Sequence, residues 1–403
     1  MMRGPIGHRE RAVRMHYGWT DEQLQFRDDL RAFIAEHRTE ELLAELDEYH
    51  DTHEYGPAMR RFRTGLDEAG FSTMAWPTEY GGQNKGAFYL FILKEELEYW
   101  GMPYDALSVL SVGTTIMRFG SESQKREWLP KIQTGEMNFA IGYTEPNAGT
   151  DLASLQTRAV RDGDEWVING QKIYTSAAHN ASHLFMAART DPEAPKHRGI
   201  SVFVFPLDTP GITVRPLWTM GGGRTNETFY EDVRIPADSI VGEENRGWYT
   251  IMNALDLERV TIGPYAPIKR VLDLMVEHVR EERPELRDDP IVRTKLAETK
   301  LDYEIARALA TTNAAIIDGG HTPTMEASMT KVWSTDMKER VSNLAMDLLG
   351  WEGALHVSNG EIAPARGDFE GRWRLSPSTR FGGGTNDVQR QIIATRGLSL
   401  PRG

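Results

Sequence analysis

The spacing of apolar residues changes twice along this chain of 403 residues. Up to about Lys131 they recur at helical spacing, after Gly135 they alternate with polar residues, and from Gly247 the helical spacing returns. A chain of this length holds more than one hydrophobic core, because single cores stop growing well before this size. We therefore expect an α+β protein with a helical domain, a β-domain and a helical bundle, over residues 1–135, 136–245 and 246–403.

Helix starts are marked in the first region, and long helices are indicated in the last. TDEQ at Thr20 and SESQ at Ser121 each place a hydroxyl residue three positions before a glutamine. Such capping boxes satisfy backbone N–H groups at the first turn of a helix. The last region is interrupted only by REERPELRDDP, DGGHTP and a glycine-rich stretch, which predicts a bundle of about four helices.

Seven short segments of the middle region have the alternation of strands: MNFAIGYT, SLQTRAV, EWVI, KIYTSA, LFMAA, ISVFVF and ETFYEDVRI. Asp162-Gly163 and Asn169-Gly170 stand at positions expected for turns. Because helices do not alternate with these segments, an antiparallel sandwich or small barrel is favoured over a Rossmann sheet. Neither a GxGxxG motif nor a Walker loop occurs, so nucleotide phosphates must be held in another way.

Composition excludes several classes of site and partner. The formal net charge of −13 repels nucleic acid and anionic lipid, and no apolar run reaches membrane-spanning length. The N-terminus lacks the apolar segment of a secretory signal, which indicates a cytoplasmic protein. Without cysteine there is no disulfide, thiolate nucleophile or iron–sulfur cluster. His179 and His183 lie four residues apart without a nearby carboxylate, so no metal site is predicted.

A carboxylate interrupts the apolar face of the helix predicted for NALDLERVTIG, residues 253–263. Ile251, Leu255, Glu258 and Ile262 follow one another at steps of four, three and four, the spacing of one helical face. A salt bridge within or between helices is the plain explanation of Glu258. If its side chain faces an apolar cavity instead, desolvation raises the pKa of the carboxyl and makes it a proton acceptor.

Two segments of the β-domain also combine small residues with hydroxyl groups. GYTEPNAGTDLAS, residues 142–154, reads either as a strand ending in a turn or as backbone that a flat ligand can approach closely. In GQKIYTSA, residues 170–177, Tyr174 and Ser176 share one face of a strand. They are either ordinary half-buried residues or a ring and a hydroxyl that face a cofactor.

Taken together, these segments resemble the acyl-CoA dehydrogenases over nearly the whole chain. That family consists of FAD enzymes with a helical domain, a β-domain and a four-helix bundle, and GYTEPNAGTD is similar to its first signature. The resemblance implies that Tyr174 replaces the usual Trp against the isoalloxazine ring, and that Ser176 replaces the Thr bonded to its hydride-accepting nitrogen. The implied FAD contacts are Ile141, Tyr143, Thr144, Gly149, Thr150, Tyr174, Thr175, Ser176, Thr385 and Asp387.

The resemblance also implies where the catalytic base lies. FGGGTNDVQRQIIATRGLSLPR is similar to the C-terminal signature of the family, but Gly383 occupies the position of the usual catalytic Glu. Isovaleryl- and long-chain-type members carry the base in an LDLER-like motif, which this chain has at 255–259. Glu258 is therefore the implied base for dehydrogenation of an acyl-CoA thioester to the trans-2-enoyl-CoA. The implied substrate contacts are Thr150, Asp256, Arg259 and Gly384.

Two further departures bear on assembly. Homotetrameric members bind the ADP half of a neighbour's FAD through RxxFG and Gln-xx-Gly-Gly segments, and neither is intact in this sequence. The pattern is similar to actinobacterial members that pair two different chains as α2β2 and act on bulky steroid side chains. An electron-transfer flavoprotein is the implied electron acceptor. The alternatives are a catalytically silent subunit, which Gly383 favours, and a fold-sharing flavin oxidase or monooxygenase.

Overall fold

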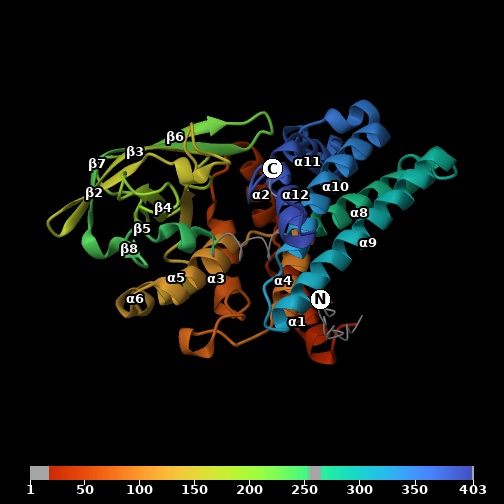
Figure 1. Ribbon diagram of the computed structural model, residues 1–403. Coiled ribbons are helices and arrows are strands. Elements are labelled where there is room, and N and C mark those ends of the chain that lie inside the picture. The colour runs from red at the N-terminus through yellow and green to blue at the C-terminus, as the bar shows by residue number, and fades with distance from the viewer. Residues whose placement is uncertain (1–17, 253, 255–264, 402–403) are drawn as a thin grey trace, which may run out of the picture.

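The computed structural model describes residues 18–252, 254 and 265–401, and the statements below concern these residues (Figure 1). Strands gather on one side of the molecule and the C-terminal helices on the other, with N-terminal helices between and beneath them (Figure 1). The predicted fold class, with helices, strands and helices in that order, is confirmed. Within the described residues, no helix has the length and apolar character required to cross a membrane.

The N-terminal helices start where the capping boxes predict. Thr20 Oγ1 accepts from the Gln23 N–H at 3.2 Å, and Ser121 Oγ accepts from the Gln124 N–H at 3.2 Å. The Oε1 of each glutamine in turn accepts from the backbone N–H of Thr20 or Ser121. The helices are α1 (Asp21–His37), α2 (Glu40–Thr52), α3 (Pro57–Glu68), α4 (Ala87–Trp100), α5 (Thr114–Phe119) and α6 (Glu122–Gln133), with a π-helical segment, η2 (Leu107–Gly113), before α5.

The middle region forms one curved sheet in the order β6-β7-β3-β2-β4-β5-β8, with β1 paired to β4. Trp166 of β3 packs against Phe203 of β5 with ring centroids 5.3 Å apart, so the two halves of the sheet enclose a common core. The strands are β1 (Phe139–Gly142), β2 (Arg158–Asp162), β3 (Glu165–Ile173), β4 (His183–Arg189), β5 (Ile200–Pro206), β6 (Ile212–Trp218), β7 (Arg224–Pro236) and β8 (Ile240–Val241).

One local prediction for this sheet is wrong, and the predicted antiparallel pairing holds for most strand pairs but not for all. Asn169-Gly170 is not a turn, because EWVI and the first two residues of KIYTSA belong to the single strand β3, with a β-bulge between Ile168 and Gly170. A Cβ at Gly170 would lie 2.5 Å from Thr157 Oγ1, so a close backbone approach requires glycine there. The pairing is also not wholly antiparallel, since β4 runs parallel to both β1 and β2.

The C-terminal region forms the predicted bundle around α10 (Figure 1). Its long helices are α8 (Ala266–Glu281), α9 (Pro290–Asp318) and α10 (Met325–Leu349), and the shorter helices α11 (Asp368–Leu375) and α12 (Asn386–Ile392) pack against α10. Helix α4 lies against both α8 and α9, which joins the bundle to the N-terminal domain. Helices α5 and α6 share a core with β4 and β5, so the N-terminal domain contacts both other domains.

Candidate functional site

The two segments with predicted flavin contacts lie side by side. The Ile173 N–H at the end of β3 donates to the Thr144 carbonyl at 2.9 Å, although the two residues belong to separate sequence segments. Thr144 is partly exposed, and Gly149 and Thr150 are exposed in the turn that follows β1. The structure therefore brings Thr144 next to the strand that leads into Tyr174.

A buried ion pair holds these two segments together. Lys172 Nζ donates to Glu145 Oε1 at 2.7 Å and to the Tyr143 carbonyl at 3.0 Å, and the lysine side chain is 0% exposed. Glu145 also accepts from the backbone N–H groups of Gln156 at 2.6 Å and Thr157 at 2.8 Å. All three charge-assisted contacts of Glu145 thus fix the turn after β1 against β2 and β3.

Ionisation of this pair reflects burial and mutual attraction. Burial opposes ionisation of Glu145, but the Lys172 ammonium and the hydrogen bonds from Thr157 and Gln156 hold the pKa of Glu145 below its usual value. Burial lowers the pKa of Lys172 to about 8, although Glu145 works in the opposite direction. Sequence reasoning missed both residues. Lys172 lies on the inward face of β3 with Trp166 and Ile168. A lysine at an inward position of a strand is the sequence signal that could have predicted a buried ion pair.

Tyr174 and Ser176 face outward together, while Thr175 faces inward. The Tyr174 side chain is 59% exposed. Ser176 is also exposed, and its Oγ lies 3.1 Å from Thr225 Oγ1. Thr175 is buried, and its hydroxyl lies 3.1 Å from that of Thr228. The outward pair presents a flat apolar surface with a hydroxyl beside it.

Strained backbone surrounds this outward pair. Tyr174 has φ 57° and Ala177 has φ 62°, in the left-handed region that non-glycine residues rarely adopt. Such conformations persist only where surrounding contacts enforce them, and they concentrate at ligand sites. The strain is therefore a second indication that 174–177 is a binding segment.

Two other predicted contacts are part of the packed interior. The Tyr143 ring is 6% exposed and lies in the core that α5 and α6 share with the sheet, 6.2 Å from the ring of Phe185. Ile141 of β1 is partly buried against the same core. Each has only limited surface for a ligand, whereas Tyr174 and Ser176 are open to one.

The glycine-rich loop before α12 carries the remaining described residues of the predicted site. Gly383 has φ 67° and Gly384 has φ 86°, conformations that favour glycine. The Gly383 carbonyl accepts from Gln389 Nε2 at 3.0 Å, and Thr385 Oγ1 caps α12 by accepting from the Val388 N–H at 3.3 Å. Asp387, in the first turn of α12, is exposed.

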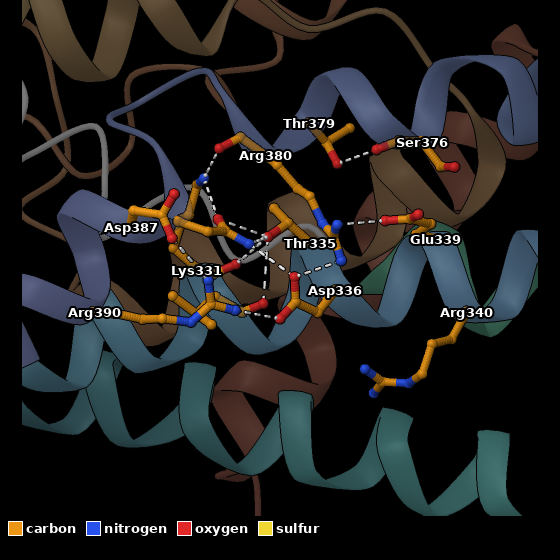
Figure 2. A network of polar contacts seen from close by, with 12 residues as sticks. Lys331, Thr335, Asp336, Glu339, Arg340, Ser376, Thr379, Arg380, Asp387 and Arg390 are labelled. Carbon is orange, nitrogen blue, oxygen red and sulfur yellow. Dashed lines mark hydrogen bonds and ion pairs between the residues drawn. The ribbon is translucent and has the colours of Figure 1, made fainter. Parts of the chain in front are cut away.

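A network between α10 and α12 fixes both ends of this loop (Figure 2). Lys331 Nζ donates to the Arg380 carbonyl at 2.8 Å and to Asn386 Oδ1 at 2.6 Å. Asp336 forms ion pairs with Arg380 and with Arg390, each at 3.0 Å. Burial lowers the pKa of Lys331 to about 8, with Asp336 opposing and the two arginines contributing. Sequence reasoning did not single out this network.

The predicted base and two substrate contacts, Glu258, Asp256 and Arg259, lie outside the described residues. The helix leading toward them is described at 247–252 and 254. Ile251, the first position of the apolar face, is buried in the core, and the Ala254 carbonyl accepts from Ser111 Oγ of η2 at 3.3 Å. The chain four residues before Glu258 is thus in contact with η2.

Where the structure describes them, the predicted site residues belong neither to a cluster of metal ligands nor to the cleft between the N-terminal helices and the bundle. In the part of the chain that the structure describes, no three His, Asp or Glu side chains group as metal ligands would. A cleft of about 900 Å³ lies between α1, α4, α8 and α9, lined by basic and aromatic side chains such as Arg38 and Trp100. None of the predicted site residues in the described ranges lines it.

Comparison with known proteins matches all three parts of the chain to one family. Residues 20–136, 140–233 and 245–398 match the family profiles described as the N-terminal, middle and C-terminal domains of acyl-CoA dehydrogenase. Acyl-CoA dehydrogenase FadE26 of Mycobacterium tuberculosis is 38% identical, over 96% of this chain and 99% of that protein. Mitochondrial isovaleryl-CoA dehydrogenase of Pongo abelii is 30% identical, over 93% of this chain and 88% of that protein.

Solved structures agree with this match. The Tcur3481-Tcur3483 steroid ACAD has a TM-score of 0.88 and 36% identity, covering 96% of this chain and 100% of that one. The ChsE4-ChsE5 complex from Mycobacterium tuberculosis has a TM-score of 0.87 and 37% identity, with the same coverage. Both names describe assemblies of two different chains.

Proposed function

The chain belongs to the acyl-CoA dehydrogenase family, and from this premise we propose that it dehydrogenates an acyl-CoA thioester with Glu258 as the base and FAD as the cofactor. The product is the trans-2-enoyl-CoA, formed by loss of one α- and one β-hydrogen. The observation that carries the cofactor assignment is the exposed ring of Tyr174, beside the Ser176 hydroxyl and on strained backbone.

These residues fit an isoalloxazine ring. Tyr174 offers a ring that is more than half exposed, and Ser176 offers an exposed hydroxyl for the edge of the isoalloxazine. Thr144, Gly149 and Thr150 lie on the adjoining turn, where small side chains leave the backbone accessible. Thr385 and Asp387 would contact the cofactor from the bundle side. Bound FAD would supply the acceptor for the β-hydride.

Glu258 and the glycine-rich loop carry the remaining chemistry. An α-proton next to a thioester is only weakly acidic, so a carboxylate desolvated in the site is the base that it requires. Gly384 is exposed and has left-handed backbone. We propose that its backbone contacts the thioester carbonyl and stabilises the negative charge that develops there. Gly383 has no side chain that could accept a proton, so Glu258 is the base in this proposal. Thr150, Asp256 and Arg259 complete the proposed substrate contacts.

We further propose a bulky, steroid side-chain acyl-CoA as substrate and an α2β2 assembly with a second, related chain. The steroid ACAD and the ChsE4-ChsE5 complex support both parts by similarity. LLGWEGALHVSNG, residues 348–360, stands where Gln-xx-Gly-Gly would be. Trp351 within it and Ile362 just after it are 85% and 73% exposed, which fits a surface covered in an assembly. An electron-transfer flavoprotein is the proposed electron acceptor, and the cytoplasm the proposed location.

Anaerobic titration with acyl-CoA tests the proposed function. The chain, co-expressed with its partner, should be yellow and should bleach when a steroid side-chain acyl-CoA is added. A complex that contains FAD but does not bleach with any acyl-CoA would favour the silent-subunit alternative, which Gly383 supports. Rapid reoxidation of the reduced complex by oxygen would favour an oxidase instead.

Expressed alone, the chain should bind clearly less than one FAD per chain. Both segments that hold a neighbour's ADP moiety in homotetramers are altered, so a self-assembled oligomer lacks half of each cofactor site. The measurement is the flavin-to-protein ratio by absorbance, before and after co-expression with the partner. One tightly bound FAD per chain in a homo-oligomer would contradict the α2β2 proposal.

Two substitutions on the proposed flavin face should separate chemistry from binding. Ser176→Ala should slow anaerobic reduction by about 3- to 10-fold, because one hydrogen bond to the ring is lost. Tyr174→Ala should mainly weaken FAD binding, through lost stacking area, while Tyr174→Phe should not. Since Ser176 also bonds Thr225, Thr225→Ala is the control. An equal effect of Thr225→Ala would assign the Ser176 result to local structure.

A further inference from the structure

The strained segment 174–177 is anchored by one buried residue of β7, Asn226. Asn226 of β7 is 0% exposed. Its main-chain carbonyl accepts from the Thr175 N–H at 2.9 Å, and its side-chain Nδ2 donates to the Thr175 carbonyl at 2.9 Å. Because Thr175 lies between Tyr174 and Ser176, this double contact fixes the directions in which both outward side chains project.

His179 holds that amide in its orientation. Asn226 Nδ2 lies 3.0 Å from His179 Nδ1, and His179 Nε2 lies 2.6 Å from the His53 carbonyl. A carbonyl oxygen only accepts hydrogen bonds, so Nε2 carries the ring proton and Nδ1 accepts from Asn226. The neutral Nε2–H form of His179 therefore satisfies every contact in this chain of bonds.

The chain of bonds starts in the N-terminal domain. His53 is the C-cap residue that follows α2, and its carbonyl also accepts from Asn180 Nδ2 at 2.7 Å. Asn180 Oδ1 in turn accepts from the Tyr55 N–H at 3.1 Å. The loop after α2 is thus tied to the β-domain at the residues next to the proposed flavin contacts.

We infer that His179 is a positioning residue: through Asn226 it fixes the backbone of Thr175 and thereby the flavin-facing geometry of Tyr174 and Ser176. This inference rests on the proposed function, in which 174–176 faces the flavin. His179 does not touch the cofactor in this arrangement and acts only through Asn226. Because histidine titrates, this role of His179 also makes the geometry of Tyr174 and Ser176 dependent on pH.

Protonation of His179 would break the chain of bonds. A proton on Nδ1 would point at the donating amide of Asn226, so one of the two groups would have to move. The charged groups facing His179 are Arg224 of β7 and Glu54 of the loop after α2, which pair with each other at 2.8 Å. Burial and Arg224 lower the pKa of His179, while Glu54 and the two hydrogen bonds oppose the shift. The neutral form is therefore retained to a pH below the usual histidine range.

The test compares two substitutions of His179 in the full-length chain, co-expressed with its partner. Phenylalanine keeps the ring but removes both bonds. Glutamine can accept from Asn226 and donate to His53, and it does not titrate. His183→Phe is the matched control, because the His183 ring is also half-buried with a lowered pKa, but among the described residues its side-chain hydrogen bond is to the neighbouring Ser182.

Two readouts are needed, one of them independent of flavin. Backbone hydrogen exchange over 174–178 at neutral pH should accelerate about tenfold in His179→Phe and remain near the wild-type rate in His179→Gln and His183→Phe. The dissociation constant for FAD in His179→Phe should be about tenfold above the wild-type value at neutral pH and should not rise further as the pH falls. In the wild type the dissociation constant should rise as the pH falls below the usual histidine range and His179 takes up a proton, and in His179→Gln this rise should be absent.

The outcomes separate the two proposals. Unchanged exchange in His179→Phe, or an acid-dependent rise that persists in His179→Gln, would overturn the role of His179. If the wild-type complex binds no FAD, the proposed function fails, and the exchange rates alone decide whether His179 holds the segment. If exchange responds to His179 but FAD affinity does not, the positioning role toward the flavin is wrong.

Discussion

Replacing Glu258 by glutamine should slow the anaerobic reduction of flavin by acyl-CoA about 10²- to 10⁴-fold or more. Glutamine keeps the size and hydrogen-bonding capacity of the side chain but does not accept the α-proton at neutral pH. FAD content, thioester binding and thermal stability should therefore stay near wild type. Stopped-flow measurement of flavin bleaching is the direct readout, with equilibrium binding of acyl-CoA as the accompanying control.

A companion substitution tests whether the base position can move. Gly383→Glu in the Glu258→Gln background places a carboxylate where most family members carry it. Recovery should be partial, because Gly383 has φ 67° and a side chain there adds backbone strain of about 1–2 kcal/mol. A bleaching rate in Glu258→Gln within about threefold of wild type would instead make Glu258 a structural carboxylate. The base would then have to come from the partner chain.

Replacing Lys172 by methionine should lower the free energy of unfolding by about 3–5 kcal/mol. Methionine matches the length of the lysine side chain but leaves the Glu145 carboxylate buried without its counter-ion. The double variant Lys172→Met/Glu145→Gln should recover part of this loss, because glutamine carries no charge to desolvate. Denaturant unfolding, followed by far-ultraviolet circular dichroism, measures the difference.

An exposed ion pair in the same region provides the control for Lys172. Lys196 pairs with Asp151 at 2.9 Å, and both side chains are more than half exposed. Lys196→Met should therefore change stability little, since solvent screens the pair. FAD affinity should fall in Lys172→Met and not in Lys196→Met, because only Lys172 joins the two proposed flavin segments. Equal effects of the two substitutions would remove the special role of the buried pair.

The domain order and the helix starts could be predicted because they depend on local patterns. Hydrophobic periodicity changes between helices and strands, and each capping box is complete within four residues, as at Thr20 and Ser121. The likeness of GYTEPNAGTD and the loop around Gly383 to family signatures is similarly local. Strand alternation predicts one face for Tyr174 and Ser176, and both are exposed, but β3 ends at Ile173 and Tyr174 has left-handed backbone, so the strand itself does not produce this arrangement.

The contacts that hold the candidate site were decided only by tertiary structure. Asn169-Gly170 is a turn signal by composition, but the close approach of Thr157 makes it a bulge within β3. Lys172 with Glu145, and His179 with Asn226 and His53, are partners from separate elements. Local sequence does not determine which polar group from a distant segment will become the hydrogen-bond partner of a residue in the folded protein. Burial makes these contacts important for stability, because a buried polar group without a hydrogen-bond partner raises the free energy of the folded state.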